Sequence, residues 1–285
     1  MPAAAAFLVA FPFYPVPAFP KLFDRLTGWR LPAFALAAAF APYVTGCLGG
    51  AIQFRWDGML RLAGMALCLG LWYLPRRMRS PLADLAFLAL IPVMLLSSYL
   101  GHIYIAAAPA LKKDLIELGH VALIEIAVTV LIVGRGVETG FGFLPTRAEW
   151  SIGVRHYLYF AAVGLPLALA VKAVHFAAPA PIWKIAATFL GFLWVNALLE
   201  EFLVRGVLQG WMEEWTRRAS AALIVTSLLF GAAHLFFLSF PNWRWALITT
   251  ILGACCGHAR NQAGGIRAGV VTHALAVTTW RAFFV

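Results

Sequence analysis

Residues 191–211 read GFLWVNALLEEFLVRGVLQGW, an apolar run that carries three charged side chains. Glu200 and Glu201 are adjacent, and Arg205 follows Glu201 by four residues. A charged side chain at the centre of a bilayer costs about 3 kcal/mol or more, so charges kept there normally serve a partner or a function. The spacing predicts an ion pair between Glu201 and Arg205 on one helix face, which leaves Glu200 free for proton chemistry.

The whole chain has the composition of a helical membrane protein. Of its 285 residues, 62% are hydrophobic and 12% are charged, whereas soluble domains are roughly half apolar and a quarter charged. Long apolar runs predict membrane-spanning helices, and membrane barrels show short alternating segments instead. We therefore expect an all-α fold, a polytopic transmembrane helix bundle with eight or nine spans. The candidate runs are 31–53, 58–75, 83–108, 117–134, 156–178, 185–211, 220–240, 245–258 and 266–285.

These runs and the loops between them predict four regions. We expect a proline-rich interfacial segment at 1–30, scaffold helices at 31–134, a cytoplasmic loop or interfacial helix at 135–155, and the catalytic transmembrane core at 156–285. The first 20 residues contain five prolines and no basic stretch typical of a signal peptide. Whether they cross the membrane is left open.

The net charge of +10 is interpreted as membrane topology. Lys and Arg are enriched in cytoplasmic loops, and no basic stripe indicates nucleic acid as a partner. One set of alternate loops holds Lys21, Arg25, Arg30, Arg76, Arg77, Arg79, Arg135, Arg147, Arg155, Arg217, Arg218, Arg260 and Arg267. The other set holds Arg55, Lys112, Lys113, Lys184 and Arg244. The bias of thirteen to five predicts that the first set is cytoplasmic.

Two later apolar runs each carry one histidine. His234 follows Phe230 by four residues in LLFGAAHLFF, and His273 follows small residues in GGIRAGVVTHALAV. Small residues let helices approach closely. A carboxylate and an imidazole that converge on one water can deprotonate it for attack on a carbonyl, while a second imidazole holds the oxyanion. We therefore expect Glu200, His234 and His273 to line one pocket.

These motifs carry a resemblance to a known family. EEFLVR fits EExxxR, Phe230 to His234 fits FxxxH, and His273 opens a final histidine motif. In this order they resemble the CAAX protease and bacteriocin-processing family of glutamate-type intramembrane endopeptidases, over roughly the last 130 residues. The resemblance implies that Glu200 and His234 activate water, that His273 stabilises the oxyanion, and that Glu201 and Arg205 orient and support them.

The resemblance also implies partners, cofactors and a location. It implies hydrolysis without a cofactor, acting on a membrane-anchored protein or peptide at a C-terminal tail, leader or sorting signal. The Ala- and Arg-rich composition favours a bacterial inner membrane, with the site accessible from the cytoplasm. The lipid bilayer is then a partner, and nothing in the sequence fixes the oligomeric state or the substrate.

One position departs from the family pattern. The family usually has Asn four residues after its final histidine, where this chain has Val277. Asn196, one turn before Glu200, is the candidate replacement donor, and Thr278 is a poorer one. If neither residue replaces the missing Asn, the oxyanion site is weaker, or the activity is lost or changed.

Three alternative interpretations stay open at this stage. A catalytic zinc could use one glutamate and two histidines, although no HExxH is present. A proton-coupled transporter also uses intramembrane carboxylates and histidines. A catalytically inactive member could bind or protect a partner. A smaller group, Glu117, His120 and Glu125, has no assigned role, and the four cysteines are expected to be buried and inert.

Overall fold

The computed structural model describes residues 2–19, 25–75 and 78–284, so the predicted loop positions of Lys21, Arg76 and Arg77 lie outside the described residues. Within those ranges every named element is a helix, which confirms the all-α prediction. Five helices are long and apolar enough to cross a membrane, whereas the predicted count of eight or nine spans stays a prediction. The chain divides into two compact units, 1–137 and 138–285.

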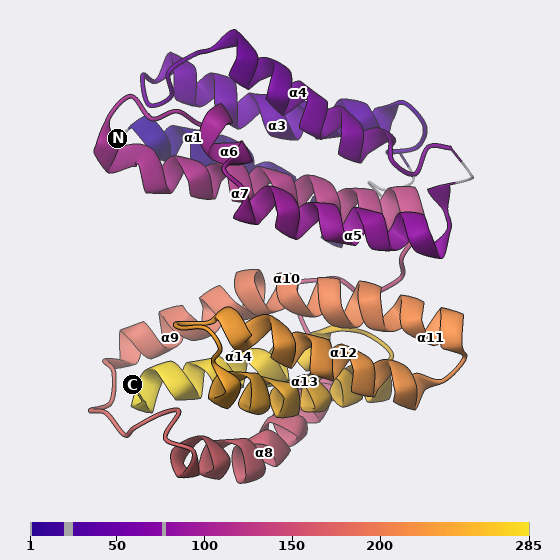
Figure 1. Ribbon diagram of the computed structural model, residues 1–285, viewed down its shortest axis with the longest axis vertical. Coiled ribbons are helices and arrows are strands. Elements are labelled where there is room, and N and C mark those ends of the chain that lie inside the picture. Colours follow the sequence, from indigo (N-terminus) through magenta and orange to yellow (C-terminus); the bar gives the residue numbers. More distant parts are fainter. Residues whose placement is uncertain (1, 20–24, 76–77, 285) are drawn as a thin grey trace. The chain divides into compact units, whose positions relative to one another are not determined.

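The first unit is a bundle built around two long apolar helices, α3 and α7 (Figure 1). Its elements are α1 (Pro2–Ala10), η1 (Phe11–Phe13), η2 (Val16–Ala18), α3 (Arg30–Leu48), α4 (Trp56–Leu71), α5 (Pro81–Leu96), α6 (Tyr99–Ile103), η4 (Pro109–Leu111), α7 (Lys112–Thr129) and η5 (Val130–Arg135). The run 83–108, predicted as one span, is broken after Leu96, where Ser97 adopts an extended backbone.

An ion pair ties α5 to the end of η5 in this unit. Arg135 donates from Nε and Nη2 to both oxygens of Asp84, each nitrogen at 2.9 Å from its nearer oxygen. Asp84 is fully buried, and Ser80 caps the helix that carries it by accepting a hydrogen bond from the backbone N–H of Ala83. Such a bidentate pair fixes the orientation of both side chains.

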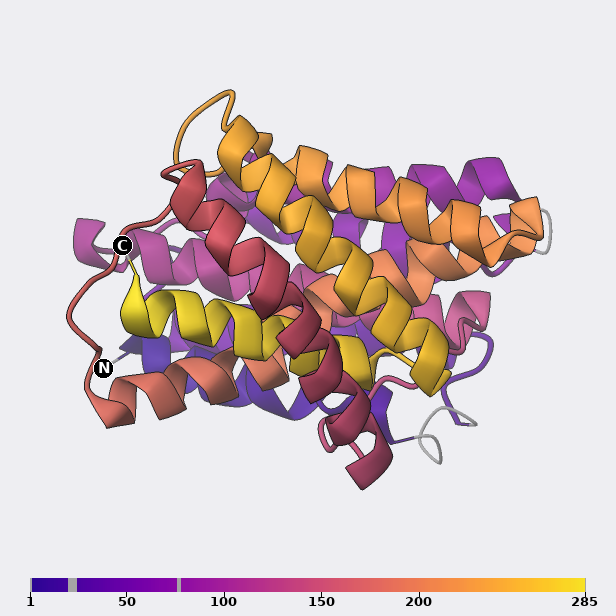
Figure 2. The ribbon, with the colours of Figure 1, turned by 90° about the horizontal axis from the view of Figure 1, so that it is seen from below.

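The second unit contains all the residues on which the predicted chemistry rests. Its elements are α8 (Arg147–Ala170), α9 (Ile182–Gly191), η6 (Phe192–Asn196), α10 (Ala197–Glu201), η7 (Phe202–Gln209), α11 (Gly210–Thr216), α12 (Ala219–Ala233), η8 (His234–Phe236), α13 (Trp243–Ala263) and α14 (Arg267–Phe283). Helix α14 packs against α8, α9 and α13 (Figure 2). Ten of its residues are buried, including His273.

Helix α8 begins inside the stretch 135–155 that was expected to be a loop or an interfacial helix. A reciprocal capping box causes the early start, because Thr146 Oγ1 accepts from the Glu149 N–H and the Glu149 carboxylate accepts from the Thr146 N–H at 2.6 Å. This motif satisfies two backbone donors that the first turn otherwise leaves unpaired. Only 136–146 is therefore irregular.

Residues 182–216 form one continuous helix whose middle is not regular α-helix. The π-helical segments η6 and η7 lie on either side of α10, the short segment that ends with the two glutamates. A π-helical stretch widens the helix and changes the direction of the side chains beyond it, and it is frequent at functional sites. The glutamate pair thus lies between two local distortions.

The helices of the second unit alternate in direction, because short connections join them. The starts of α8, α12 and α14 and the ends of α11 and α13 lie at one end, which also holds Arg147, Arg217, Arg218, Arg260 and Arg267. We call it the arginine-rich end. The connections 171–181 and 237–242 lie at the opposite end.

The positive-inside rule predicts that the arginine-rich end is cytoplasmic. Two exposed serines report on the two ends, Ser220 at the arginine-rich end and Ser239 at the other. With the four native cysteines replaced by alanine, Ser239→Cys should react with a membrane-impermeant maleimide in intact cells, and Ser220→Cys only after permeabilisation. The reverse labelling pattern would show that the charge bias misassigns the topology.

Candidate active site

The two adjacent glutamates lie in different environments. Glu201 is fully buried, whereas the Glu200 side chain is 43% exposed and lines a cavity. Neighbouring residues on a helix differ in direction by about 100°, so one carboxylate can face the protein interior while the next faces an open space. The sequence-based expectation that the two side chains diverge agrees with this placement.

Glu201 forms the ion pair that its spacing predicts. Arg205 Nε lies 3.4 Å from Glu201 Oε2, and both side chains are fully buried. The guanidinium carbon lies 4.8 Å from the centre of the Phe230 ring, which adds a cation–π contact. Among the described residues no hydrogen-bond partner is found for the three guanidinium nitrogens. The carboxylate and the aromatic ring are therefore the groups that balance this buried charge.

His273 joins the two glutamates. Its Nδ1 lies 2.8 Å from Glu201 Oε1, and its Nε2 lies 3.8 Å from Glu200 Oε2. Because a buried carboxylate accepts hydrogen bonds, Nδ1 carries the proton in this contact and Nε2 is directed to the cavity side. The imidazole is fixed in orientation by one glutamate and presented to the other.

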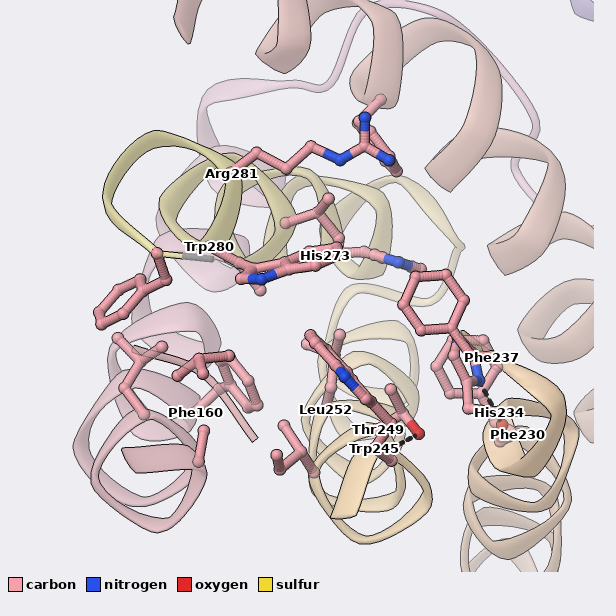
Figure 3. Close-up of a pocket in the computed structure, with 18 of the residues that line it drawn as sticks. Phe160, Phe230, His234, Phe237, Trp245, Thr249, Leu252, His273, Trp280 and Arg281 are labelled. Carbon is pink, nitrogen blue, oxygen red and sulfur yellow. Dashed lines mark hydrogen bonds between the residues drawn. The ribbon is translucent and has the colours of Figure 1, made fainter. Parts of the chain in front are cut away.

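His234 reaches the same cavity without touching His273. Its Nδ1 donates to the backbone oxygen of Phe230 at 2.8 Å, which leaves Nε2 for the cavity. The Phe230 ring contacts both imidazoles, with centroid separations of 4.8 Å to His234 and 5.7 Å to His273. Figure 3 shows the two histidines on separate helices around one hollow. Phe230 is thus a spacer between them.

The cavity has a volume of about 230 Å³ and a mainly apolar wall. Glu200, His234 and His273 all line it, as the motifs predict. Asn196 and Val277 line it too, whereas Thr278 is not among its lining residues. The other lining residues are Phe160, Leu165, Ala168, Val174, Phe192, Phe230, Phe237, Trp245, Ile248, Thr249, Leu252, Ala276, Trp280, Arg281 and Phe284.

Three glycines that the motif search missed surround the buried ion pair. A Cβ on Gly253 would lie 3.0 Å from Arg205 Nη2, and one on Gly269 would lie 3.2 Å from Glu201 Oε2 and 3.0 Å from the Cys256 backbone oxygen. A Cβ on Gly257 would also meet neighbouring side chains. The signal was present, since Gly253 and Gly257 form a GxxxG motif in LGACCGHAR. Small residues make room for the guanidinium between helices.

A different group of potential metal ligands lies beside this pair. The donor atoms of Glu201, Cys256 and His273 are all within 4.8 Å of one another, which is not the glutamate and two histidines considered from the sequence. Arg205 contacts the same carboxylate, and its positive charge opposes a cation at this position. The arrangement fits hydrogen-bonded support of Glu201 better than a metal centre.

The smaller group of Glu117, His120 and Glu125 belongs to the first unit. His120 Nδ1 lies 3.4 Å from Glu117 Oε2, and both are partly exposed on α7. Glu125 is 2% exposed, and within the described part of the chain neither of its carboxyl oxygens has a hydrogen-bond partner. Its function stays unassigned.

The cavity lies toward the end of the second unit that is opposite the arginine-rich end. Its wall includes Trp245 and Leu252 from the first half of α13, and Ala276 and Trp280 from the second half of α14. The expected cytoplasmic opening and the expected cytoplasmic position of the arginine-rich loops are therefore in conflict. If the charge bias holds, the cavity opens toward the other face of the membrane.

Comparison with known proteins finds a family match for part of the second unit. Residues 181–279 match the model of a family described as type II CAAX prenyl endopeptidase Rce1-like. This confirms the resemblance inferred from the motifs, and it supports an intramembrane endopeptidase activity in general terms. The matched segment contains every predicted site residue from Asn196 to His273. The searches of curated proteins and of solved structures return no match.

The buried ion pair gives a prediction for stability. Removing one partner of a buried pair typically costs about 3–5 kcal/mol, because the other charge is left without compensation. Arg205→Met should therefore lower the thermal unfolding temperature strongly, and the double variant Glu201→Gln/Arg205→Met should recover part of the loss. Thermal unfolding of the purified protein measures both. Additive destabilisation in the double variant would mean that the two side chains are not energetically coupled.

Proposed function

We propose that this chain is a glutamate-type intramembrane endopeptidase that hydrolyses a peptide bond with an activated water. The observation that carries the proposal is the chain of contacts from Arg205 through Glu201 and His273 to Glu200, at the edge of a cavity inside an apolar helix bundle. The buried pair of Glu201 and Arg205 orients the imidazole of His273 toward the half-exposed carboxylate of Glu200. This arrangement suits proton transfer better than a role in helix packing alone.

The proposed reaction assigns one step to each group. Glu200, assisted by His234 Nε2, takes a proton from a water in the cavity, and the hydroxide oxygen attacks the carbonyl carbon of the peptide. Glu201 holds the proton on Nδ1 of His273. When Nε2 of His273 is protonated as well, that nitrogen donates a hydrogen bond to the carbonyl oxygen, which becomes negative during the attack. Glu200 then returns its proton to the leaving nitrogen as the C–N bond breaks. Arg205 keeps Glu201 ionised and in place.

The substrate that suits this cavity is a membrane-anchored protein or peptide. Its mainly apolar wall would accept apolar side chains, and substrates could enter from the lipid bilayer. We propose cleavage at a C-terminal tail, a leader or a sorting signal, in a bacterial inner membrane. Entry from the cytoplasm, as the family resemblance implies, requires a topology opposite to the charge bias, and the labelling of Ser220→Cys and Ser239→Cys decides between them.

We propose that no metal or other cofactor takes part. Peptide hydrolysis by this scheme needs only the water and the named side chains. The nearest set of potential ligands is already engaged with Arg205 and with its own members. A transporter is not favoured, since the family match covers the whole ionisable cluster.

Loss of the base should abolish hydrolysis while leaving the fold intact. Glu200→Gln keeps the size of the side chain and removes the proton acceptor, so we expect about a hundredfold lower cleavage or more. The assay follows cleavage of candidate membrane-anchored substrates by purified protein, with and without a chelator. Glu138→Gln, an exposed glutamate outside the cavity, is the matched control and should cleave like wild type. Full activity of Glu200→Gln would refute the proposed base.

The departure at Val277 gives a rescue experiment. Asn196 and Val277 line the same cavity, and loss of one oxyanion donor costs about a hundredfold in rate. Asn196→Ala should therefore slow cleavage by about that factor, and adding Val277→Asn should recover at least about a tenth of the lost rate. Cleavage kinetics of the single and double variants measure this. An unchanged cleavage rate in Asn196→Ala would show that Asn196 is not the replacement donor. A slower rate in Asn196→Ala that Val277→Asn does not raise would show that Asn196 and position 277 do not serve the same oxyanion.

A further inference from the structure

A second hollow lies between α8 and α13, near the arginine-rich end. It has a volume of about 480 Å³ and is lined by Arg155, His156, Tyr159, His258, Asn261 and Gln262. No carboxylate is among these residues. None of them lines the cavity of the proposed active site, so this hollow is not accounted for by the proposed hydrolysis.

Two histidines form the inner wall of the hollow. His156 is 2% exposed, and its Nδ1 donates to the backbone oxygen of Ile152 at 2.9 Å. Its Nε2 must then accept, and it lies 3.1 Å from His258 Nδ1. His258 therefore donates from Nδ1, and because the residue is exposed its Nε2 is available to a ligand.

Asn261 and Arg155 both offer hydrogen-bond donors to the hollow. Asn261 Oδ1 accepts from Gln209 Nε2 at 2.8 Å and from Arg260 at 2.9 Å, which leaves the amide nitrogen of Asn261 for the hollow. Arg260 is itself paired with Glu213 at 2.6 Å. In the described parts of the chain Arg155 makes no ion pair with a carboxylate and is exposed. The free positive charge of this region thus belongs to Arg155.

The position of the hollow suits a membrane interface. His156 follows the start of α8 by nine residues and His258 precedes the end of α13 by five, so they lie roughly 13 Å and 8 Å from those helix ends at about 1.5 Å per residue. Basic pockets between membrane helices at this depth bind the head groups of anionic lipids. Tyr159 adds a side chain that is typical of the interface.

We propose that this hollow is a binding site for the phosphate-bearing head group of an anionic membrane lipid. Arg155 supplies the ionic contact, and Asn261, Gln262 and Tyr159 supply hydrogen-bond donors to the phosphate and glycerol oxygens. His258 Nε2 accepts a hydrogen bond from a glycerol hydroxyl of the head group. The buried His156 holds the His258 ring in place. Since α8 and α13 also carry Phe160 and Leu252 of the catalytic cavity, a bound lipid bridges two helices that form its wall.

The site can be tested on the full-length protein in detergent. Thermal unfolding is followed while phosphatidylglycerol, phosphatidylcholine or inorganic phosphate is added, for wild type and for Arg155→Gln/His258→Gln. We expect phosphatidylglycerol to raise the unfolding temperature of wild type at lower concentration than phosphatidylcholine does. Loss of the ionic contact of Arg155 and of the hydrogen bond of His258, at about 1 kcal/mol each, should weaken apparent lipid affinity at least about tenfold in the double variant. Arg147→Gln removes the same charge from α8 outside the hollow and should bind like wild type.

Each other outcome overturns the lipid assignment. An equal response of wild type and the double variant to phosphatidylglycerol would show that the lipid binds elsewhere. Saturation by inorganic phosphate with no added effect of the lipid would identify a free phosphate site. Stabilisation by zinc that a chelator reverses, without a lipid response, would identify a two-histidine metal site. Circular dichroism of the double variant checks that it folds, and cleavage activity is not needed for any readout.

Discussion

The second unit is organised around one buried carboxylate. Glu201 has no exposure to solvent, and its partners come from different elements: Arg205 from η7, His273 from α14 and the Cys256 thiol from α13. A carboxylate buried without partners costs several kcal/mol, so the ion pair with Arg205 and the hydrogen bond with His273 compensate its burial. Satisfying Glu201 therefore fixes how three helical segments pack, and it fixes the direction of the His273 ring as a consequence. Gly253 and Gly269 make the close approach possible.

The two adjacent glutamates, Glu200 and Glu201, have different roles. The buried Glu201 orients an imidazole, and the half-exposed Glu200, one residue earlier, meets the other side of that imidazole in the cavity. Both glutamates lie in the short α-helical segment α10, which has a π-helical segment on either side. Phe230 completes the geometry by separating His234 from His273 while stacking beneath Arg205.

The sequence predicted the parts of this arrangement that depend on spacing along one helix or on strong composition. The all-helical fold, the Glu201–Arg205 contact, the divergence of the glutamates and the placement of three motif residues on one cavity are of this kind. The apolar run predicted from the sequence begins at 156, whereas α8 begins at Arg147. The polar first turns are helical because the capping box of Thr146 and Glu149 starts the helix there. The GxxxG motif of Gly253 and Gly257 indicates a close helix contact but not the partner that it admits. That partner, the position of Phe230 between the two imidazoles and the end toward which the cavity lies depend on contacts between distant segments. The two-histidine hollow was missed for the same reason, since His156 and His258 are far apart in the chain.

The central claim is that Glu200, as the base, and His273, as the oxyanion donor, act as a single unit in the hydrolysis of one peptide bond. A double-mutant cycle on cleavage rate tests it most directly, with Glu200→Gln, His273→Gln and the variant that combines them. Residues that act as a unit are strongly non-additive, so the combined variant should be about as slow as the slower single variant. Rate losses that multiply would show that the two groups contribute independently, and would contradict the account.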